Sequence, residues 1–316
     1  MNTTHESIYA HYVGWLNTHD ITPRTRTYKC RQILRYLEFL EDLNVSATLV
    51  SSSHIQAYMQ VLGKLNPRTY NCHLLNLKQF WRFLTEHYEM RSLVRSPKPK
   101  PVPATLPRYV PLNLMTQLLT PGPEENMESL LAKRDQAILE FLFSTGVRSI
   151  ELRNIRFGDV SADLSECKIQ TAKKGRQRIV FLGNAARSSL QAYLSLRQEA
   201  GTLYPSDWLF LSKHGSALCC SSVARRVKSL AVRRLGFIVT PHQFRHSFAT
   251  EMLRASGCLR SVQVLLGHVK IRNTGIYCAL ELSDKNQAMQ YFHPNGSKVD
   301  EQNHQNSLAA ILDKEA

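Results

Sequence analysis

The chain has 316 residues, of which 43% are hydrophobic, and it carries a formal net charge of +15. This length suffices for two ordinary domains, and this apolar content excludes a largely disordered chain. A positive excess of this size attracts polyanions, and nucleic acid is the most common reason for it. Charge alone leaves open the alternative of a basic protein without a nucleic-acid partner.

The N-terminal residues show no basic start followed by an apolar run, so they do not resemble a signal peptide. No stretch approaches the about 20 apolar residues that cross a bilayer. Seven cysteines without a CxxC pair argue against a disulfide framework and a zinc site, and they suit a reducing compartment. We therefore expect a soluble cytoplasmic protein without a metal site or a membrane partner. The cysteines are Cys30, Cys72, Cys167, Cys219, Cys220, Cys258 and Cys278.

Residues 1–95 follow a helical pattern, in which Ile8 and Tyr12 begin the first apolar stripe. Thr22 and Asn66 each precede a proline, and a capping side chain before proline is a good helix start. The count of helical segments predicts a small four-helix domain. Its basic side chains are candidates for phosphate contacts, although each one alone is more simply a solvated surface charge. These side chains are Arg24, Arg26, Lys29, Arg31, Arg35, Arg68, Lys78 and Arg82.

Residues 96–108, SPKPKPVPATLPR, contain five prolines, which fix φ and remove backbone donors. Neither a helix nor a central strand can continue through them, so the stretch predicts an extended, semi-rigid linker between two domains. Lys98 and Lys100 give the linker positive charge, with which it can lie along a phosphate backbone. A passive connector is the alternative, and the sequence does not separate the two.

Residues 109–293 predict a longer domain of mixed structure, and residues 294–316 predict a polar tail with a short amphipathic end. Ala132–Phe143 is an apolar helix that stops near Gly146, where a residue without a Cβ atom suits a helix C-terminus.

Two β-prone runs, 168–172 and 178–182, flank a group of cations at 173–176. This arrangement predicts a hairpin with a cationic tip. The expected fold class is mainly α with a small β hairpin: an N-terminal four-helix domain followed by a mixed α/β domain.

A further helix start is predicted at Thr240-Pro241, because threonine caps a helix and proline fits its first position. His242, Arg245 and His246 then share one helix face, since positions three and four apart are neighbours. Two imidazoles and a guanidinium at a helix N-terminus suit an oxyanion such as phosphate. The spacing H-x-x-R is weak evidence alone, and an ordinary structural role is the alternative.

Other polar side chains stand at predicted junctions. Arg148, in TGVRSIEL, lies between two predicted helices, and Glu151 can fix its guanidinium in one rotamer. An ordinary local ion pair is the alternative for these two residues. Lys173 lies at the hairpin tip, and His268 ends the segment LLGH, with Tyr277 nine residues later. None of these is informative alone, but their combination and order are.

This order resembles the tyrosine recombinase family, which includes phage integrases and Xer-type proteins. TGVRSIEL is similar to the family segment TGxRxSEL, and LLGHVKIRNTGIY is similar to LLGHxxIxTTxIY. PHQFRHSFAT resembles PHxLRHSFAT, with Phe244 where leucine is usual. The resemblance covers residues 109–293 strongly and residues 1–95 more weakly, as a helical core-binding domain. The matching positions are Arg148, Lys173, His242, Arg245, His268 and Tyr277.

The resemblance implies a role for each of these side chains. Tyr277 would be the nucleophile, attacking a phosphodiester to give a 3′-phosphotyrosyl link and a free 5′-hydroxyl. Arg148 and Arg245 would clamp the non-bridging oxygens in the transition state. Lys173 would protonate the leaving 5′-oxygen, and His242 would assist proton transfer to or from the tyrosine.

His268 would hydrogen-bond the phosphate or its clamp, and Glu151 would orient the other side chains. Because this set does the work of metal ions in other phosphoryl-transfer enzymes, the resemblance implies no cofactor. Lys174 remains a competitor of Lys173, since the chain has AKKG where the family often has GKG. His246 is more simply explained by a structural hydrogen bond than by catalysis.

The resemblance further implies that the partner is double-stranded DNA with a specific recombination site. Four protomers, identical or paired with a related recombinase, would act on two duplexes. The expected function is site-specific recombination, by integration, excision or resolution. A type IB-like topoisomerase and a non-catalytic DNA-binding protein on the same fold are the alternatives. The presence of the nucleophile with both arginines favours catalysis, and the N-terminal domain with its linker favours a recombinase.

Overall fold

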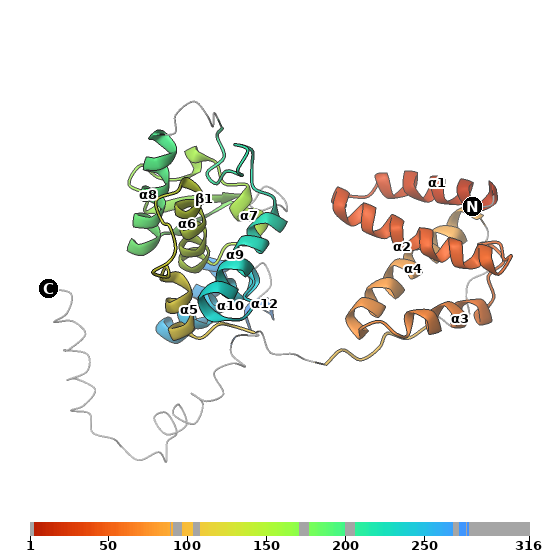
Figure 1. Cartoon of the computed structure of the whole chain (residues 1–316). Coiled ribbons are helices and arrows are strands. Elements are labelled where there is room, and N and C mark those ends of the chain that lie inside the picture. The colour runs from red at the N-terminus through yellow and green to blue at the C-terminus, as the bar shows by residue number, and fades with distance from the viewer. Residues whose placement is uncertain are drawn as a thin grey trace, which may run out of the picture. The chain divides into compact units, whose positions relative to one another are not determined.

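The chain divides into two compact units, Met1–Ala104 and Thr105–Ala316, in the computed structural model (Figure 1). The division falls inside the proline-rich stretch, while the functional roles of the two expected domains stay a prediction. The described residues are 3–88, 90, 97–103, 108–170, 177–199, 206–267, 272–275 and 277.

The described part of the first unit contains four helices, in agreement with the expected count. Thr22 accepts a hydrogen bond from the Thr25 amide at 3.3 Å, and Asn66 accepts one from the Arg68 amide at 3.0 Å. Both caps stand immediately before a proline, where the sequence predicts a helix start. The helices are α1 (Thr3–Asn17), α2 (Pro23–Asp42), α3 (Ser52–Leu62) and α4 (Pro67–Tyr88).

The core of the first unit is rich in aromatic side chains. Tyr12, Phe80 and Phe83 are fully buried, and the rings of Tyr12 and Phe80 meet edge to face with centroids 5.0 Å apart. Trp81 donates a hydrogen bond from Nε1 to the Tyr36 hydroxyl at 3.2 Å. Burial of each large apolar side chain stabilises the unit by about 1.5–3 kcal/mol, so these rings account for much of its packing.

The start of the proline-rich stretch is bound to this unit. The Lys100 amide donates to Asn71 Oδ1 at 2.7 Å, and Asn71 Nδ2 donates to the Lys100 carbonyl at 2.8 Å. The Lys100 ammonium donates to the Gly63 carbonyl at 2.7 Å and lies 4.5 Å from the centroid of the Tyr70 ring. Lys100 is therefore engaged within the protein, whereas Lys98 is exposed.

The second unit combines helices with one described two-stranded sheet, which confirms the expected fold class. The strands are antiparallel, with Glu166 opposite Phe181 and Gln170 opposite Gln177. The expected cationic tip of the hairpin lies outside the described residues. The described elements are α5 (Leu112–Leu119), α6 (Leu130–Thr145), α7 (Ser149–Arg153), the 3-10 helix η1 (Phe157–Asp159), β1 (Glu166–Gln170), β2 (Gln177–Phe181), α8 (Asn184–Glu199), α9 (Cys220–Leu235), α10 (Pro241–Ser256), α11 (Leu259–Leu266) and α12 (Arg272–Gly275).

Helix α6 lies in the middle of this unit and packs against α8 and α10 (Figure 1). Ala137, Phe141 and Leu142 are fully buried, because a helix that is apolar around most of its circumference belongs inside a domain. The helix ends at Gly146, whose φ of 59° is left-handed. A Cβ atom here would lie 2.4 Å from Phe248 Cδ1, so only glycine fits. No helix in the described part of the chain is long and apolar enough to span a membrane.

Candidate active site

Helix α10 carries the predicted H-x-x-R motif and begins where the sequence predicts. Thr240 Oγ1 accepts from the Gln243 amide at 3.4 Å, and Gln243 Oε1 accepts from the Thr240 amide at 3.0 Å. This reciprocal cap, with Pro241 at the first position, fixes the start of the helix. Phe244 is fully buried, so the helix is anchored in the core directly beside the motif.

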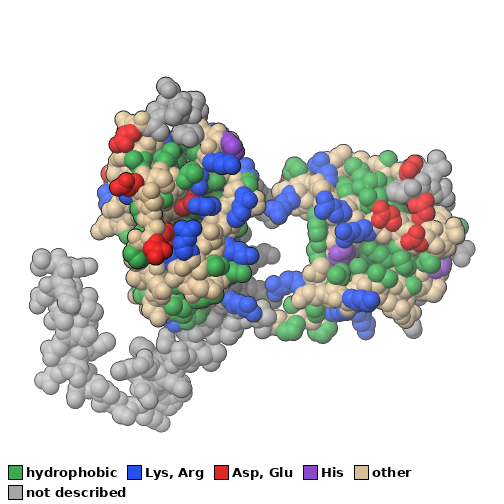
Figure 2. Space-filling view, in the orientation of Figure 1, with side chains coloured by type: hydrophobic (Ala, Val, Ile, Leu, Met, Phe, Trp, Pro, Cys, Tyr) green, Lys and Arg blue, Asp and Glu red, His purple; other side chains and the backbone are tan. Residues whose placement is uncertain are grey.

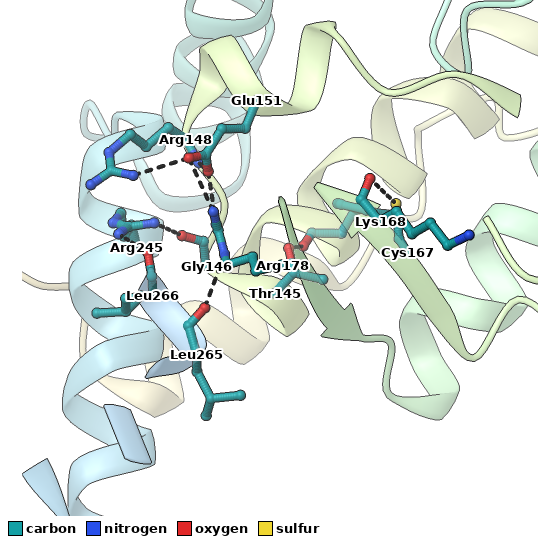
Figure 3. Close-up of polar contacts among 11 residues, drawn as sticks. Thr145, Gly146, Arg148, Glu151, Cys167, Lys168, Arg178, Arg245, Leu265 and Leu266 are labelled. Atoms are coloured by element: carbon teal, nitrogen blue, oxygen red, sulfur yellow. Dashed lines mark hydrogen bonds and ion pairs between the residues drawn. The ribbon is translucent and has the colours of Figure 1, made fainter. Parts of the chain in front are cut away.

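Arg245 is 2% exposed, and backbone carbonyls hold its guanidinium (Figure 3). Nη1 donates to the Gly146 carbonyl at 2.6 Å, and Nη2 donates to the Leu266 carbonyl at 2.7 Å. These carbonyls stand at the C-terminal ends of α6 and α11, where the helix dipole is negative. Burial, followed by the nearby Arg148, lowers the pKa of Arg245, yet this guanidinium remains charged at neutral pH.

The Arg148 guanidinium is bound by Glu151 on one side and is exposed to solvent on the other. Its amide donates to Glu151 Oε2 at 2.9 Å, and its Nη1 donates to Glu151 Oε1 at 3.0 Å. The Arg148 side chain is 42% exposed, whereas the Glu151 side chain is only 3% exposed. The carboxylate therefore orients a guanidinium that still faces solvent, where a ligand can reach it.

Glu151 has a second cationic partner, Arg178, which no motif in the sequence indicated. Arg178 donates from Nη2 to Glu151 Oε2 at 2.8 Å and from Nη1 to Oε1 at 3.2 Å. Burial alone would raise the pKa of Glu151. The hydrogen bonds and charges of Arg178 and Arg148 outweigh burial and hold this pKa below its ordinary value. The carboxylate is therefore ionised at neutral pH.

Tyr277 lies in the small apolar cluster formed by α10 and α11, and it is 1% exposed. Its hydroxyl is 3.0 Å from His246 Nδ1, so His246 rather than His242 makes the hydrogen bond to the phenol. Burial raises the pKa of Tyr277, and the positive charges of Arg245 and Arg148 oppose that rise. Both arginines therefore act electrostatically on the phenol.

The two histidines of α10 pack edge to face, with ring centroids 4.3 Å apart. Burial and the neighbouring His242 and Arg245 lower the pKa of His246 to about 4. Burial and the charges of Arg245 and Arg148 also lower the pKa of His242. Both imidazoles are therefore neutral at physiological pH, and each can donate through one nitrogen and accept through the other.

Six of the singled-out side chains thus come together around one point. They are Arg148, Glu151, His242, Arg245, His246 and Tyr277. Lys173, its competitor Lys174, and His268 lie outside the described residues. With Arg178 included, the group holds three guanidinium groups and one carboxylate, so positive charge is in excess and suits a phosphodiester. Among the residues described, no group of three or more His, Cys, Asp or Glu could hold a metal ion.

Residues 116–283 match the family described as the phage integrase family. Tyrosine recombinase XerC of Haemophilus ducreyi is 32% identical over 288 residues, which cover 88% of this chain and 91% of that protein. Tyrosine recombinase XerC of Stutzerimonas stutzeri is 37% identical over 195 residues, which cover 61% of this chain and 62% of that protein, less than two thirds of its length. The chain belongs to the phage integrase family, and the family expectation is confirmed.

Solved structures show the same fold at low sequence identity. XerH site-specific recombinase bound to a palindromic difH substrate matches with a TM-score of 0.70 and 20% identity, over 85% of this chain and 80% of that chain. A lambda integrase tetramer bound to a Holliday junction matches with a TM-score of 0.63 and 13% identity, over 86% of this chain and 76% of that chain.

Proposed function

We propose that this chain is a site-specific DNA recombinase that cleaves and rejoins strands through Tyr277. One observation supports the roles proposed for these residues. The Tyr277 hydroxyl forms a hydrogen bond to an imidazole of the H-x-x-R helix. The positive charges of Arg245 and Arg148 both favour the ionised form of this phenol. A phenol, an imidazole and two guanidinium groups at one point are the groups that a metal-independent attack on a phosphodiester needs.

In the proposed reaction, Tyr277 Oη attacks the phosphorus and the bond from phosphorus to the 5′-oxygen breaks. The product is a 3′-phosphotyrosyl bond and a free 5′-hydroxyl. The phenol loses its proton to the histidine pair, and the 5′-oxygen gains a proton from Lys173, for which Lys174 remains the competitor. Rejoining is the reverse reaction with the 5′-hydroxyl of another strand. No cofactor is consumed, because the phosphotyrosyl bond conserves the energy of the broken bond.

Arg148 and Arg245 hold the non-bridging oxygens in this proposal. Arg148 is partly exposed and already oriented by Glu151, so it can bind phosphate without leaving its partner. Arg245 uses its bonds to Gly146 and Leu266 for orientation, and a guanidinium carries three further N–H donors with which it can bind an oxygen. His268 adds a further hydrogen bond to the phosphate or to its clamp.

The histidine pair takes up the proton only once DNA is bound. In the free chain, Arg245 helps to keep both imidazoles neutral, and Arg148 acts in the same direction on His242. A bound phosphodiester adds a negative charge beside these guanidinium groups, so the pKa of each imidazole rises. His246 is the nearer acceptor for the proton of Tyr277, and His242 lies next to it.

The substrate is double-stranded DNA, on which four protomers, identical or paired with a related recombinase, act on two duplexes. The charge of +15 and the DNA-bound forms of XerH and lambda integrase support this part of the proposal. Lys and Arg side chains lie on the visible face of each unit (Figure 2).

Helix α2 has an exposed stripe that suits a DNA backbone. Arg24, Tyr28, Arg31 and Arg35 are exposed, and their spacing places them along one side of the helix. We assign residues 1–95 to a core-binding domain, 96–108 to a linker and 109–293 to the catalytic domain. Residues 294–316 form the tail, and the chain works in the cytoplasm.

A topoisomerase and a non-catalytic DNA-binding protein are not favoured, because a relative that matches along most of the chain is named a tyrosine recombinase. The test is to map covalent protein–DNA adducts with the native chain and with Tyr277→Phe. We expect adducts at discrete sites with the native chain and none with the variant, at equal DNA binding. Adducts formed by Tyr277→Phe would contradict the role of Tyr277. Relaxation of a plasmid that lacks those sites would support the topoisomerase.

A further inference from the structure

We infer that Arg178 is a positioning residue, which holds Glu151 and the end of α11 in register with the phosphate-binding arginines. The inference rests on the proposed function, because Arg148 and Arg245 must bind phosphate for their alignment to matter. Arg178 lies on β2, opposite Ile169 of β1, and its side chain extends between α7 and α11 (Figure 3).

The first link runs from Arg178 to Glu151. Both terminal nitrogens of Arg178 donate to the two oxygens of Glu151, at 2.8 and 3.2 Å. Such a two-point contact fixes the plane of the carboxylate as well as its position. The same carboxylate binds the amide and the guanidinium of Arg148. The direction of the Arg148 side chain is therefore set by Arg178 through Glu151.

The second link runs from Arg178 to the end of α11. Arg178 Nε donates to the Leu265 carbonyl at 3.2 Å, and Arg245 donates to the next carbonyl, of Leu266. Two arginines thus hold adjacent carbonyls of this helix end. Gly267 follows with φ of 63°, and a Cβ atom there would lie 3.0 Å from Arg178 Cδ. The helix end consequently fits closely against the Arg178 side chain, directly before His268 in the sequence.

Arg178 is placed to orient other groups and not to bind the phosphate itself. Its side chain is 11% exposed, against 42% for Arg148, and Nε, Nη1 and Nη2 each already donate to a protein oxygen. Its removal would leave the Glu151 carboxylate buried with only Arg148 to balance it. A buried carboxylate that loses a cation is costly, so the carboxylate takes up a proton more readily.

The test is single-turnover cleavage of a nicked duplex that carries a site found by the adduct mapping. Cleavage is measured against DNA concentration and pH for Arg178→Met, Arg178→Lys, Glu151→Gln and the double variant Arg178→Met/Glu151→Gln. Arg187→Met is the matched control, because Arg187 is a partly exposed arginine of the same unit, and its guanidinium donates to the Asp163 carbonyl at 3.0 Å. Thermal unfolding shows which variants fold.

We expect Arg178→Met to slow the maximal cleavage rate by about 10- to 100-fold, the usual effect of losing an outer partner of a functional group. Half-saturating DNA should change little, and Arg178→Lys should recover part of the rate. The loss of rate at low pH should begin at a higher pH in Arg178→Met, because the pKa of Glu151 rises. The double variant should lose that shift and cleave no more slowly than the slower single variant.

Cleavage by Arg178→Met at the rate of Arg187→Met would overturn the inference. A slower rate in Arg178→Met with no change in the pH at which the rate falls would also overturn it. So would a double variant whose loss of rate equals the product of the two single losses. If Arg178→Met does not fold, the maximal cleavage rate of Arg178→Lys decides, because lysine keeps the charge but loses the two-point contact, and a rate equal to that of Arg187→Met would overturn the inference. Adducts formed by Tyr277→Phe would overturn the proposed function instead, so the two failures are distinguishable.

Discussion

Replacing His246 tests how the protein holds Tyr277, the proposed nucleophile. The Tyr277 hydroxyl is buried, and its hydrogen-bond partner is His246 Nδ1 at 3.0 Å. His246→Ala leaves this hydroxyl without that partner, which costs about 1–3 kcal/mol for a buried polar group. If the transition state for cleavage loses the same free energy of stabilisation, cleavage slows by about 5- to 150-fold. His246→Asn keeps a polar group near the position of Nδ1 and should lose less.

The pH dependence of stability gives a second readout of the same contact. The pKa of His246 is about 4 in the folded chain and about 6.5 in an unfolded one, so the unfolded chain binds more protons between these values. Native stability therefore falls as pH decreases through this window. The whole difference corresponds to at most about 3 kcal/mol, and solvent screening of the imidazole lowers this figure. His246→Asn removes this component, while His242 supplies a remaining slope of the same sign.

The assay combines urea unfolding from pH 4 to 8 with single-turnover cleavage at neutral pH. We expect His246→Ala to be less stable and slower at neutral pH, and both His246 variants to show a flatter decline of stability towards acid. An unchanged cleavage rate in His246→Ala would refute the idea that this imidazole positions the phenol. An unchanged acid slope would refute the assignment of a low pKa to His246.

Two further changes test the fold and the DNA-binding surface. Gly146→Ala should destabilise by about 2–5 kcal/mol, from left-handed backbone strain and the clash with Phe248. Gly257→Ala has the same φ of 59° with nothing within 4 Å of its Cβ atom, so it should show the strain alone in urea unfolding; equal losses would contradict the clash. Arg31→Ala should weaken binding to all duplexes and reduce the slope of log affinity against log salt by about 1; an unchanged slope would exclude a phosphate contact.

Local features of the fold were predictable because they depend on neighbouring residues. The starts of α2, α4 and α10 follow from a capping side chain before proline, and the end of α6 follows from Gly146. The hairpin was predicted, but β1 begins at Glu166, two residues earlier than expected. The start of β1 is set by the pairing of Glu166 with Phe181 across the sheet. The β propensity of residues along the chain gives no information about this pairing.

The contacts that organise the site were harder to predict because they are non-local. His246 meets Tyr277 31 residues later, and Arg178 meets Glu151 27 residues earlier. One signal for Arg178 was nevertheless present. Alternation along β2 puts Arg178 on the same face as the buried Val180, whereas Ile179 and Phe181 are half exposed. A charged residue on the buried face of a strand requires a partner, and here the partner is Glu151.

The choice of partners explains how the site keeps its charge for DNA. Arg148 and Arg178 share one carboxylate, and backbone carbonyls at two helix ends orient Arg245. Carbonyls align a guanidinium without cancelling its charge, whereas a second carboxylate would lower the positive charge of the site and compete with phosphate. The burial of Arg245 beside Arg148 is unfavourable in the free chain, as the lowered pKa of Arg245 indicates. On the proposed function, a bound phosphodiester would relieve that repulsion, so part of the cost of assembling the site would be recovered when DNA binds.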